Sequence, residues 1–171
     1  MRDPRTYVQS HINWAKHRPK SFIANFLTPF WQPNAYLLGE ARFWQWVQAK
    51  PLERFSWIWD FKNRQIEYAD RGEGSYYRVR FEDLFDRATP GQTFNQVLSF
   101  IGIPQVTGLE DRFRHRANPN KADSFPHWEN WTPQMCKALN GWCKRQMDRY
   151  GYGSESVWQE KLRSHAIKEG N

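Results

Sequence analysis

The sequence predicts a predominantly helical chain with one or two strands, which belongs to the α/β class if those strands join a sheet. Residues 52–69, 94–101 and 135–143 repeat apolar side chains at close to the 3.6-residue period of a helix. Residues 76–81 alternate instead with the two-residue period of a strand. Aromatic residues make up 17% of the 171 positions, a composition that favours a folded core over disorder.

The first helix is expected to begin at Asp3 and Pro4. An Asp side chain caps free backbone N–H groups, and Pro is accepted at the first helical position. This helix should continue through Trp14 and end before Pro19. Residues 19–36 are rich in proline and aromatic side chains, so we expect a loop with at most short helical turns.

Two helices, over residues 39–49 and 52–69, are predicted next, with Pro51 between them. A turn is expected at residues 71–74, where two glycines alternate with charged residues.

The strand predicted at residues 76–81 places Tyr77 and Val79 on one face and Arg78 and Arg80 on the other. A single strand cannot form a sheet. Either the domain is mostly helical, or this strand pairs with segments that the sequence does not contain. The second interpretation, an α/β fold, is favoured by the motifs described below.

The C-terminal half reads as helix, loop and helix. A helix over residues 94–101 is closed by glycine and proline, and residues 118–126 are polar and irregular. Thr132, followed by proline, predicts a capped helix that Gly151 ends. The polar tail, residues 153–171, is expected to be a loosely docked helix outside the main domain of residues 1–152.

The formal charge of the chain is +7, from 25 Lys and Arg against 18 Asp and Glu. This excess favours an anionic partner: nucleic acid, a membrane surface or a small phosphorylated ligand. No apolar stretch approaches the length of a membrane-spanning helix, and no signal region follows Met1.

The two cysteines, Cys136 and Cys143, lie seven positions apart in one predicted helix. That spacing separates them by roughly 10 Å, too far for a disulfide within the helix, and two thiols fall short of a zinc site. We therefore expect a reducing, cytoplasmic location and no metal.

The most informative segment runs from Arg2 to Ser10. A guanidinium just before a capped helix start, with a hydroxyl eight residues later, could bind a phosphate near the positive end of the helix dipole. Arg2 would have to fold back along the helix to share an anion with Ser10. The alternative is that Arg2 pairs with Asp3 or solvent while Ser10 faces the core.

Two further segments carry candidate chemistry. Glu82 and Asp83 end the predicted strand, but adjacent residues there point to opposite sides, so a helix-start or ion-pair role is favoured over an acid pair. Lys121, beside Asn120, would matter only if an anion lies near its loop.

Together these segments resemble the PAPS-dependent sulfotransferases. Arg2-Asp3-Pro4-Arg5 with Ser10 is similar to that family's 3′-phosphate motif. Arg80-Phe81-Glu82-Asp83-Leu84 resembles its Arg-Tyr-Glu-Asp-Leu strand end. Asn120-Lys121, Trp128 and Arg149-Tyr150-Gly151-Tyr152 resemble its C-terminal loop and last helix. The resemblance implies the C-terminal part of an α/β, P-loop-like nucleotide-binding fold.

The resemblance also implies roles for individual residues. Arg2 and Ser10 would hold the 3′-phosphate of 3′-phosphoadenosine 5′-phosphosulfate (PAPS), and Lys121 with Asn120 would close over it. Phe81 stands where the family has a tyrosine near the nucleotide, so a polar contact there is lost. A small-molecule or glycan acceptor would receive the sulfuryl group, and residues 22–36 are a candidate acceptor wall or simply a cover for the core.

The family's Gly-rich loop with its catalytic lysine, and its upstream catalytic base, have no counterpart in this sequence. We therefore predict no turnover by this chain alone, and a need for a complementing N-terminal segment. Two other readings stay open: a basic, aromatic-rich nucleic-acid-binding module and a structural remnant without a ligand.

Overall fold

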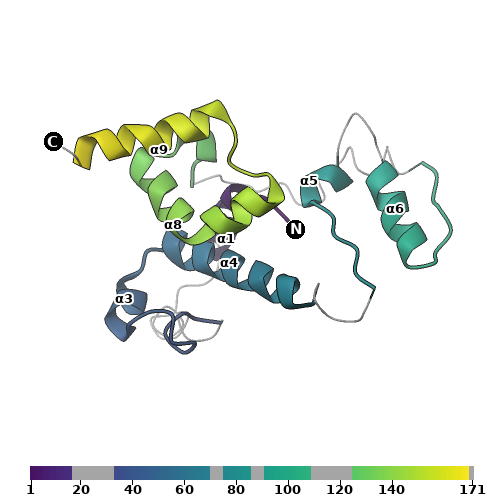
Figure 1. The fold of residues 1–171 in the computed structure, drawn as a ribbon, viewed down its shortest axis with the longest axis horizontal. Helices are drawn as coiled ribbons and strands as arrows, with labels where there is room; N and C mark the ends of the chain where they lie inside the picture. Colours follow the sequence, from purple (N-terminus) through teal and green to yellow (C-terminus); the bar gives the residue numbers. More distant parts are fainter. Residues whose placement is uncertain (17–32, 70–74, 86–90, 109–124, 170–171) are drawn as a thin grey trace.

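A computed structural model describes residues 1–16, 33–69, 75–85, 91–108 and 125–169, and the regular elements in these ranges are all helices (Figure 1). They are α1 (Pro4–Lys16), α3 (Phe43–Gln48), α4 (Pro51–Ala69), α5 (Phe81–Leu84), α6 (Gln92–Phe100), the 3-10 helix η1 (Trp128–Asn130), α8 (Pro133–Tyr150) and α9 (Ser156–Glu169).

The predicted α/β class is wrong for the described part of the chain, which contains no strand or sheet. Residues 75–80 lead into α5 without regular structure. The Met1 amine donates to the carbonyl of Val79 over 2.8 Å, and the N–H of Phe81 donates to the Met1 carbonyl. This parallel pairing is one residue long, and a strand needs a longer ladder to form a sheet.

Helices α1, α4 and α8 form the centre of the molecule, with α9 packed against α8 (Figure 1). Local signals start α1 and α8. The Asp3 side chain accepts from the N–H of Arg5 over 2.8 Å, and the Thr132 hydroxyl accepts from the N–H of Met135 over 3.3 Å. Gly151 ends α8 with a φ of 73°, a left-handed conformation that glycine adopts without strain. These three predicted helix boundaries, the start of α1 and both ends of α8, are confirmed.

The main core is built from side chains of α1, α4, α8, α9 and the segment before α8. Its buried members include Val8, Trp59, Trp131, Leu139, Cys143 and Trp158. Cys136 and Cys143 are both buried, and they do not form a disulfide with each other, as expected from their spacing. A second cluster gathers Trp46 against Trp57 and Ile58, and so fixes α3 on α4.

The C-terminal tail packs on the main core around Trp158. Trp158 of α9 is 1% exposed and contacts the rings of Trp128 and Trp131. The Lys161 ammonium donates to the carbonyl of Trp131 over 2.8 Å. This helix therefore lies on the body that the preceding residues form.

Helices α5 and α6 lie at one end of the molecule, away from the central helices (Figure 1). The first turn of α5 carries Glu82 and Asp83, so their predicted helix-start role is confirmed. Gly102 follows the end of α6, as predicted, with a φ of 74°.

Some boundaries differ from prediction. The helix expected over residues 39–49 begins only at Phe43. The N–H groups of Glu40 and Ala41 both donate to the carbonyl of Ala35, so these residues form a turn before the helix. The turn at 71–74, and most of the loops at 19–36 and 118–126, lie outside the described residues.

Candidate functional site

Arg2 lies at the entrance of α1, and its side chain folds back onto the helix. Its Nε donates to the hydroxyl of Thr6 over 3.3 Å. Its backbone carbonyl accepts from the indole N–H of Trp59 over 2.8 Å, which ties this position to α4. The guanidinium is therefore held at the start of α1 by both its backbone and its side chain.

Ser10 follows Thr6 by one helical turn. Residues four apart on a helix share a face, so the half-buried Ser10 lies on the side of α1 along which Arg2 folds. The side chain of Arg2 therefore folds toward the face of α1 that carries Ser10. The alternative pairing of Arg2 with Asp3 is not what its side chain makes.

Phe81 lies against Arg2, although the two are far apart in sequence. The guanidinium carbon of Arg2 is 5.1 Å from the centroid of the Phe81 ring, a cation–π arrangement. The ring is 41% exposed at the start of α5. Two residues predicted to contact the nucleotide are therefore neighbours on an open surface. Asn120 and Lys121, the remaining members of the predicted site, lie outside the described residues.

Glu82 joins the three segments that carry the resemblance. One carboxylate oxygen accepts from the N–H of Asp3 over 2.9 Å, and the other accepts from the hydroxyl of Tyr152 over 2.8 Å. Asp83 points elsewhere and pairs with Arg80, with 3.6 Å between Oδ1 and Nε. The two carboxylates do not form a dyad, and Glu82 holds the start of α1 beside the end of α8.

Arg5 is a residue whose role the sequence analysis missed. Its side chain is 2% exposed, and it pairs with both Asp3 and Glu155 at 2.6 Å. Its guanidinium carbon also lies 4.1 Å from the centroid of Trp128. The pairing with Arg5 lowers the pKa of Glu155, and the two carboxylates raise the pKa of Arg5 despite its burial. Arg5 therefore serves the fold and is not available to a ligand.

His11 follows Ser10 but faces the protein. Its Nδ1 lies 2.9 Å from the carbonyl of Tyr7, and its ring packs against Tyr7 and Phe55. Burial is the largest cause that lowers the pKa of His11, and the charges of Lys62 and Arg2 lower it further. This neutral, packed imidazole supports a structural role for His11.

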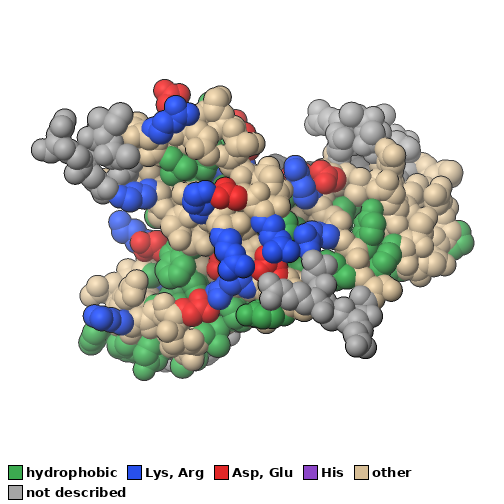
Figure 2. All heavy atoms as spheres, viewed as in Figure 1, with side chains coloured by type: hydrophobic (Ala, Val, Ile, Leu, Met, Phe, Trp, Pro, Cys, Tyr) green, Lys and Arg blue, Asp and Glu red, His purple; other side chains and the backbone are tan. Residues whose placement is uncertain are grey.

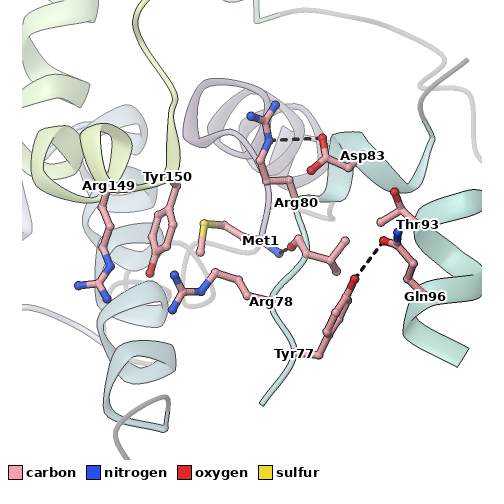
Figure 3. Close-up of a pocket in the computed structure, with 10 residues that line it drawn as sticks. Met1, Tyr77, Arg78, Arg80, Asp83, Thr93, Gln96, Arg149 and Tyr150 are labelled. Carbon is pink, nitrogen blue, oxygen red and sulfur yellow. Dashed lines mark hydrogen bonds and ion pairs between the residues drawn. The ribbon is translucent and has the colours of Figure 1, made fainter. Parts of the chain in front are cut away.

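A separate cleft of about 550 Å³ lies between the 77–80 segment and the end of α8 on one side and α6 on the other (Figure 3). Its described lining includes Arg78, Arg80 and Arg149 with Tyr77 and Tyr150, but not Arg2, Ser10 or Phe81. Basic side chains also gather near the middle of the face in Figure 2, with acidic ones among them. The sequence placed Arg78 and Arg80 together but gave no signal that α8 would join them.

None of the described helices combines the length and the apolar character that crossing a membrane requires. In the same residues, no group of three or more His, Cys, Asp and Glu side chains is arranged to hold a metal ion.

No protein-family model matches this chain, and searches of curated proteins and solved structures find no significant match either. The resemblance stated above therefore depends on the quoted motifs alone.

Proposed function

We propose that this chain binds PAPS through its 3′-phosphate, as the sulfotransferase-like motifs imply, for sulfuryl transfer to an acceptor hydroxyl or amine. The observation that carries the proposal is the contact between Arg2 and Phe81, 5.1 Å from guanidinium carbon to ring centroid. The motifs assign both residues to the nucleotide independently, and they come from distant parts of the sequence. Their contact supports a common ligand.

The chemistry of the α1 entrance suits a phosphate dianion. A guanidinium donates a planar pair of hydrogen bonds to two phosphate oxygens, and such charge-assisted bonds are about twice as strong as neutral ones. The hydroxyl of Ser10 can donate to a third oxygen. The first turn of α1 carries no acidic residue, but the carboxylates of Asp3 and Glu82 already accept from N–H groups at this helix end, so the phosphate would depend on Arg2 and Ser10. Phe81 offers an apolar face beside the same anion.

The proposal gives these residues a positioning role. In sulfuryl transfer an SO3 group passes in line to the acceptor oxygen or nitrogen, which loses a proton, and adenosine 3′,5′-bisphosphate leaves. Fixing the donor by a remote phosphate lowers the barrier through orientation. We assign no catalytic residue in this chain. The free thiols of Cys136 and Cys143 accord with the proposed cytoplasmic location.

Thermal unfolding with adenosine 3′,5′-bisphosphate tests the proposal. A ligand at about 100 times its Kd stabilises the folded state by about 2.7 kcal/mol, so the melting temperature should rise with concentration. Arg2→Ala should weaken the affinity for the bisphosphate at least tenfold, and Ser10→Ala should weaken this affinity by a smaller factor. Arg163→Ala, which removes an equal charge from an exposed position on α9, is the matched control.

Two further ligands separate this proposal from its rivals. Adenosine 5′-phosphate lacks the 3′-phosphate and should stabilise the chain less than the bisphosphate. Random single-stranded oligonucleotides should bind weakly. Tight, steeply salt-dependent binding of oligonucleotides that ignores Arg2→Ala would favour the nucleic-acid-binding alternative.

A further inference from the structure

We infer that the cleft between α8 and α6 binds a phosphate or sulfate ester, with the oxyanion held by Arg78, Arg149 and the hydroxyl of Tyr150. The inference is independent of the proposed function, because its residues differ from those at the α1 entrance.

The hydroxyl of Tyr150 is the first observation. Tyr150 is 8% exposed, and within the described residues its hydroxyl is buried and has no hydrogen-bond partner. A buried polar atom without a partner is uncommon and costs stability. Burial also raises the pKa of Tyr150, so the hydroxyl keeps its proton at neutral pH and remains a donor.

Among the described residues, no acceptor is hydrogen-bonded to this hydroxyl. Figure 3 shows the hydroxyl end of Tyr150 between the side chains of Arg78 and Arg149. The guanidinium carbons of these arginines lie 5.2 Å and 6.0 Å from the Tyr150 ring centroid. Guanidinium groups only donate hydrogen bonds. An anion placed among the three groups would supply the acceptor oxygens.

The described lining of the cleft carries more basic than acidic side chains. Glu67 pairs with Arg149, with 2.9 Å between Oε1 and Nη1. Asp83, the carboxylate in the described lining, pairs with Arg80 instead. The described lining holds three arginines and one aspartate, which favours a ligand with one or two negative charges.

The size and the opposite wall of the cleft predict an organic body on the anion. A volume of about 550 Å³ lies in the usual range for small-molecule sites and exceeds what an inorganic phosphate needs. Tyr77 is 39% exposed, and its hydroxyl donates to Oε1 of Gln96 on α6 over 3.1 Å, which holds the ring in place. A ring on the ester could stack on this tyrosine.

Calorimetric titration of the full chain with phenyl phosphate tests the site. We expect saturable one-to-one binding, tighter than that of inorganic phosphate, while neutral phenol should bind at least tenfold more weakly than phenyl phosphate. Phenyl sulfate, titrated in parallel, distinguishes a sulfate-ester site from a phosphate-ester site. Absence of saturable binding for both esters would overturn the inference.

Two variants locate the binding. Tyr150→Phe keeps the ring and removes a hydroxyl without a partner, so the melting temperature should hold while ester affinity falls about tenfold. Arg78→Gln, at an exposed position, should weaken binding at least tenfold, whereas Arg163→Ala should not change it. Wild-type affinity in both Tyr150→Phe and Arg78→Gln refutes the site. So does loss of ester binding in Arg2→Ala, which would place the ester at the α1 entrance.

Discussion

Two arginines of the first motif, Arg2 and Arg5, differ in burial and in the groups they contact. Arg5 is buried between two carboxylates and an indole, whereas Arg2 lies at the surface beside Phe81. The difference follows from the helix start between them. Asp3 caps α1 and turns its carboxylate toward Arg5, which leaves Arg2 free of that pairing.

Replacing Arg5 should be severely destabilising. Arg5→Met would leave the buried Asp3 carboxylate without its partner, and breaking a buried ion pair from one side costs about 3–5 kcal/mol. Arg5→Lys should also be less stable than the wild type, because one ammonium cannot pair bidentately with two carboxylates while lying flat on Trp128. Urea denaturation measures both losses.

An exposed ion pair supplies the control. Lys144 and Asp148 are paired on the surface of α8, with more than half of each side chain exposed. Lys144→Met should therefore cost less than about 1 kcal/mol. Equal losses of stability in Arg5→Met and Lys144→Met would show that the buried ion pairs of Arg5 stabilise the fold no more than a surface ion pair does.

His11 should make stability depend on pH. Its folded-state pKa lies below the ordinary value of about 6.5, so the unfolded chain binds the proton more readily. The free energy of unfolding should therefore increase as the pH rises toward about 6.5 and level off above that value. His11→Gln should remove this part of the dependence in urea denaturation between about pH 5 and pH 7.5. Arg2→Ala should retain most of it, because burial is the largest cause of the shift. An unchanged pH profile in His11→Gln would contradict this account.

At the scale of elements, Glu82 connects α5 to the start of α1 and to Tyr152, just after α8. We expect Glu82→Gln and Tyr152→Phe each to cost about 1–2 kcal/mol, since both remove a hydrogen bond to a charged group. The double variant should cost less than the sum, because the two substitutions remove one shared bond. Strict additivity in urea denaturation would show that the carboxylate and the hydroxyl do not interact.

The helices that the sequence predicts best are those with local boundary signals. Asp3, Thr132 and Gly151 act on neighbouring backbone groups, so their effect is readable without the fold. The strand at residues 76–81 was wrong because pairing depends on distant segments. The alternation of Tyr77, Val79 and the arginines indicates a segment that is able to pair with a strand. In the structure its backbone pairs with Met1 alone.

At the scale of the whole molecule, the candidate sites depend on contacts between distant segments. Sequence motifs proposed Arg2, Ser10 and Phe81, and the contact between Arg2 and Phe81 required the fold. The cleft was not predicted, because Arg149 and Tyr150 reach it from α8, far along the chain from Arg78. A sequence shows which residues could bind an anion, but tertiary packing determines which of them face one another.

The end of the molecule formed by α5 and α6 exposes more apolar side chains than the central body does. Large apolar side chains there are 41–56% exposed: Phe81, Phe85, Phe100, Ile101, Ile103 and Val106. By comparison, the central helix α4 buries Trp57 and Trp59, which are 0% and 2% exposed. Residue Phe81 at the α1 entrance belongs to this open end, so a ligand can reach it without unfolding the body.

The most direct test of the central claim is a binding cycle at the α1 entrance. Adenosine 3′,5′-bisphosphate and adenosine 5′-phosphate are titrated calorimetrically into the wild type and Arg2→Ala. We predict that the wild type prefers the bisphosphate at least tenfold, and that Arg2→Ala removes most of this preference while changing the affinity for adenosine 5′-phosphate little. An equal preference in both proteins, or none in the wild type, would contradict binding of the 3′-phosphate by Arg2.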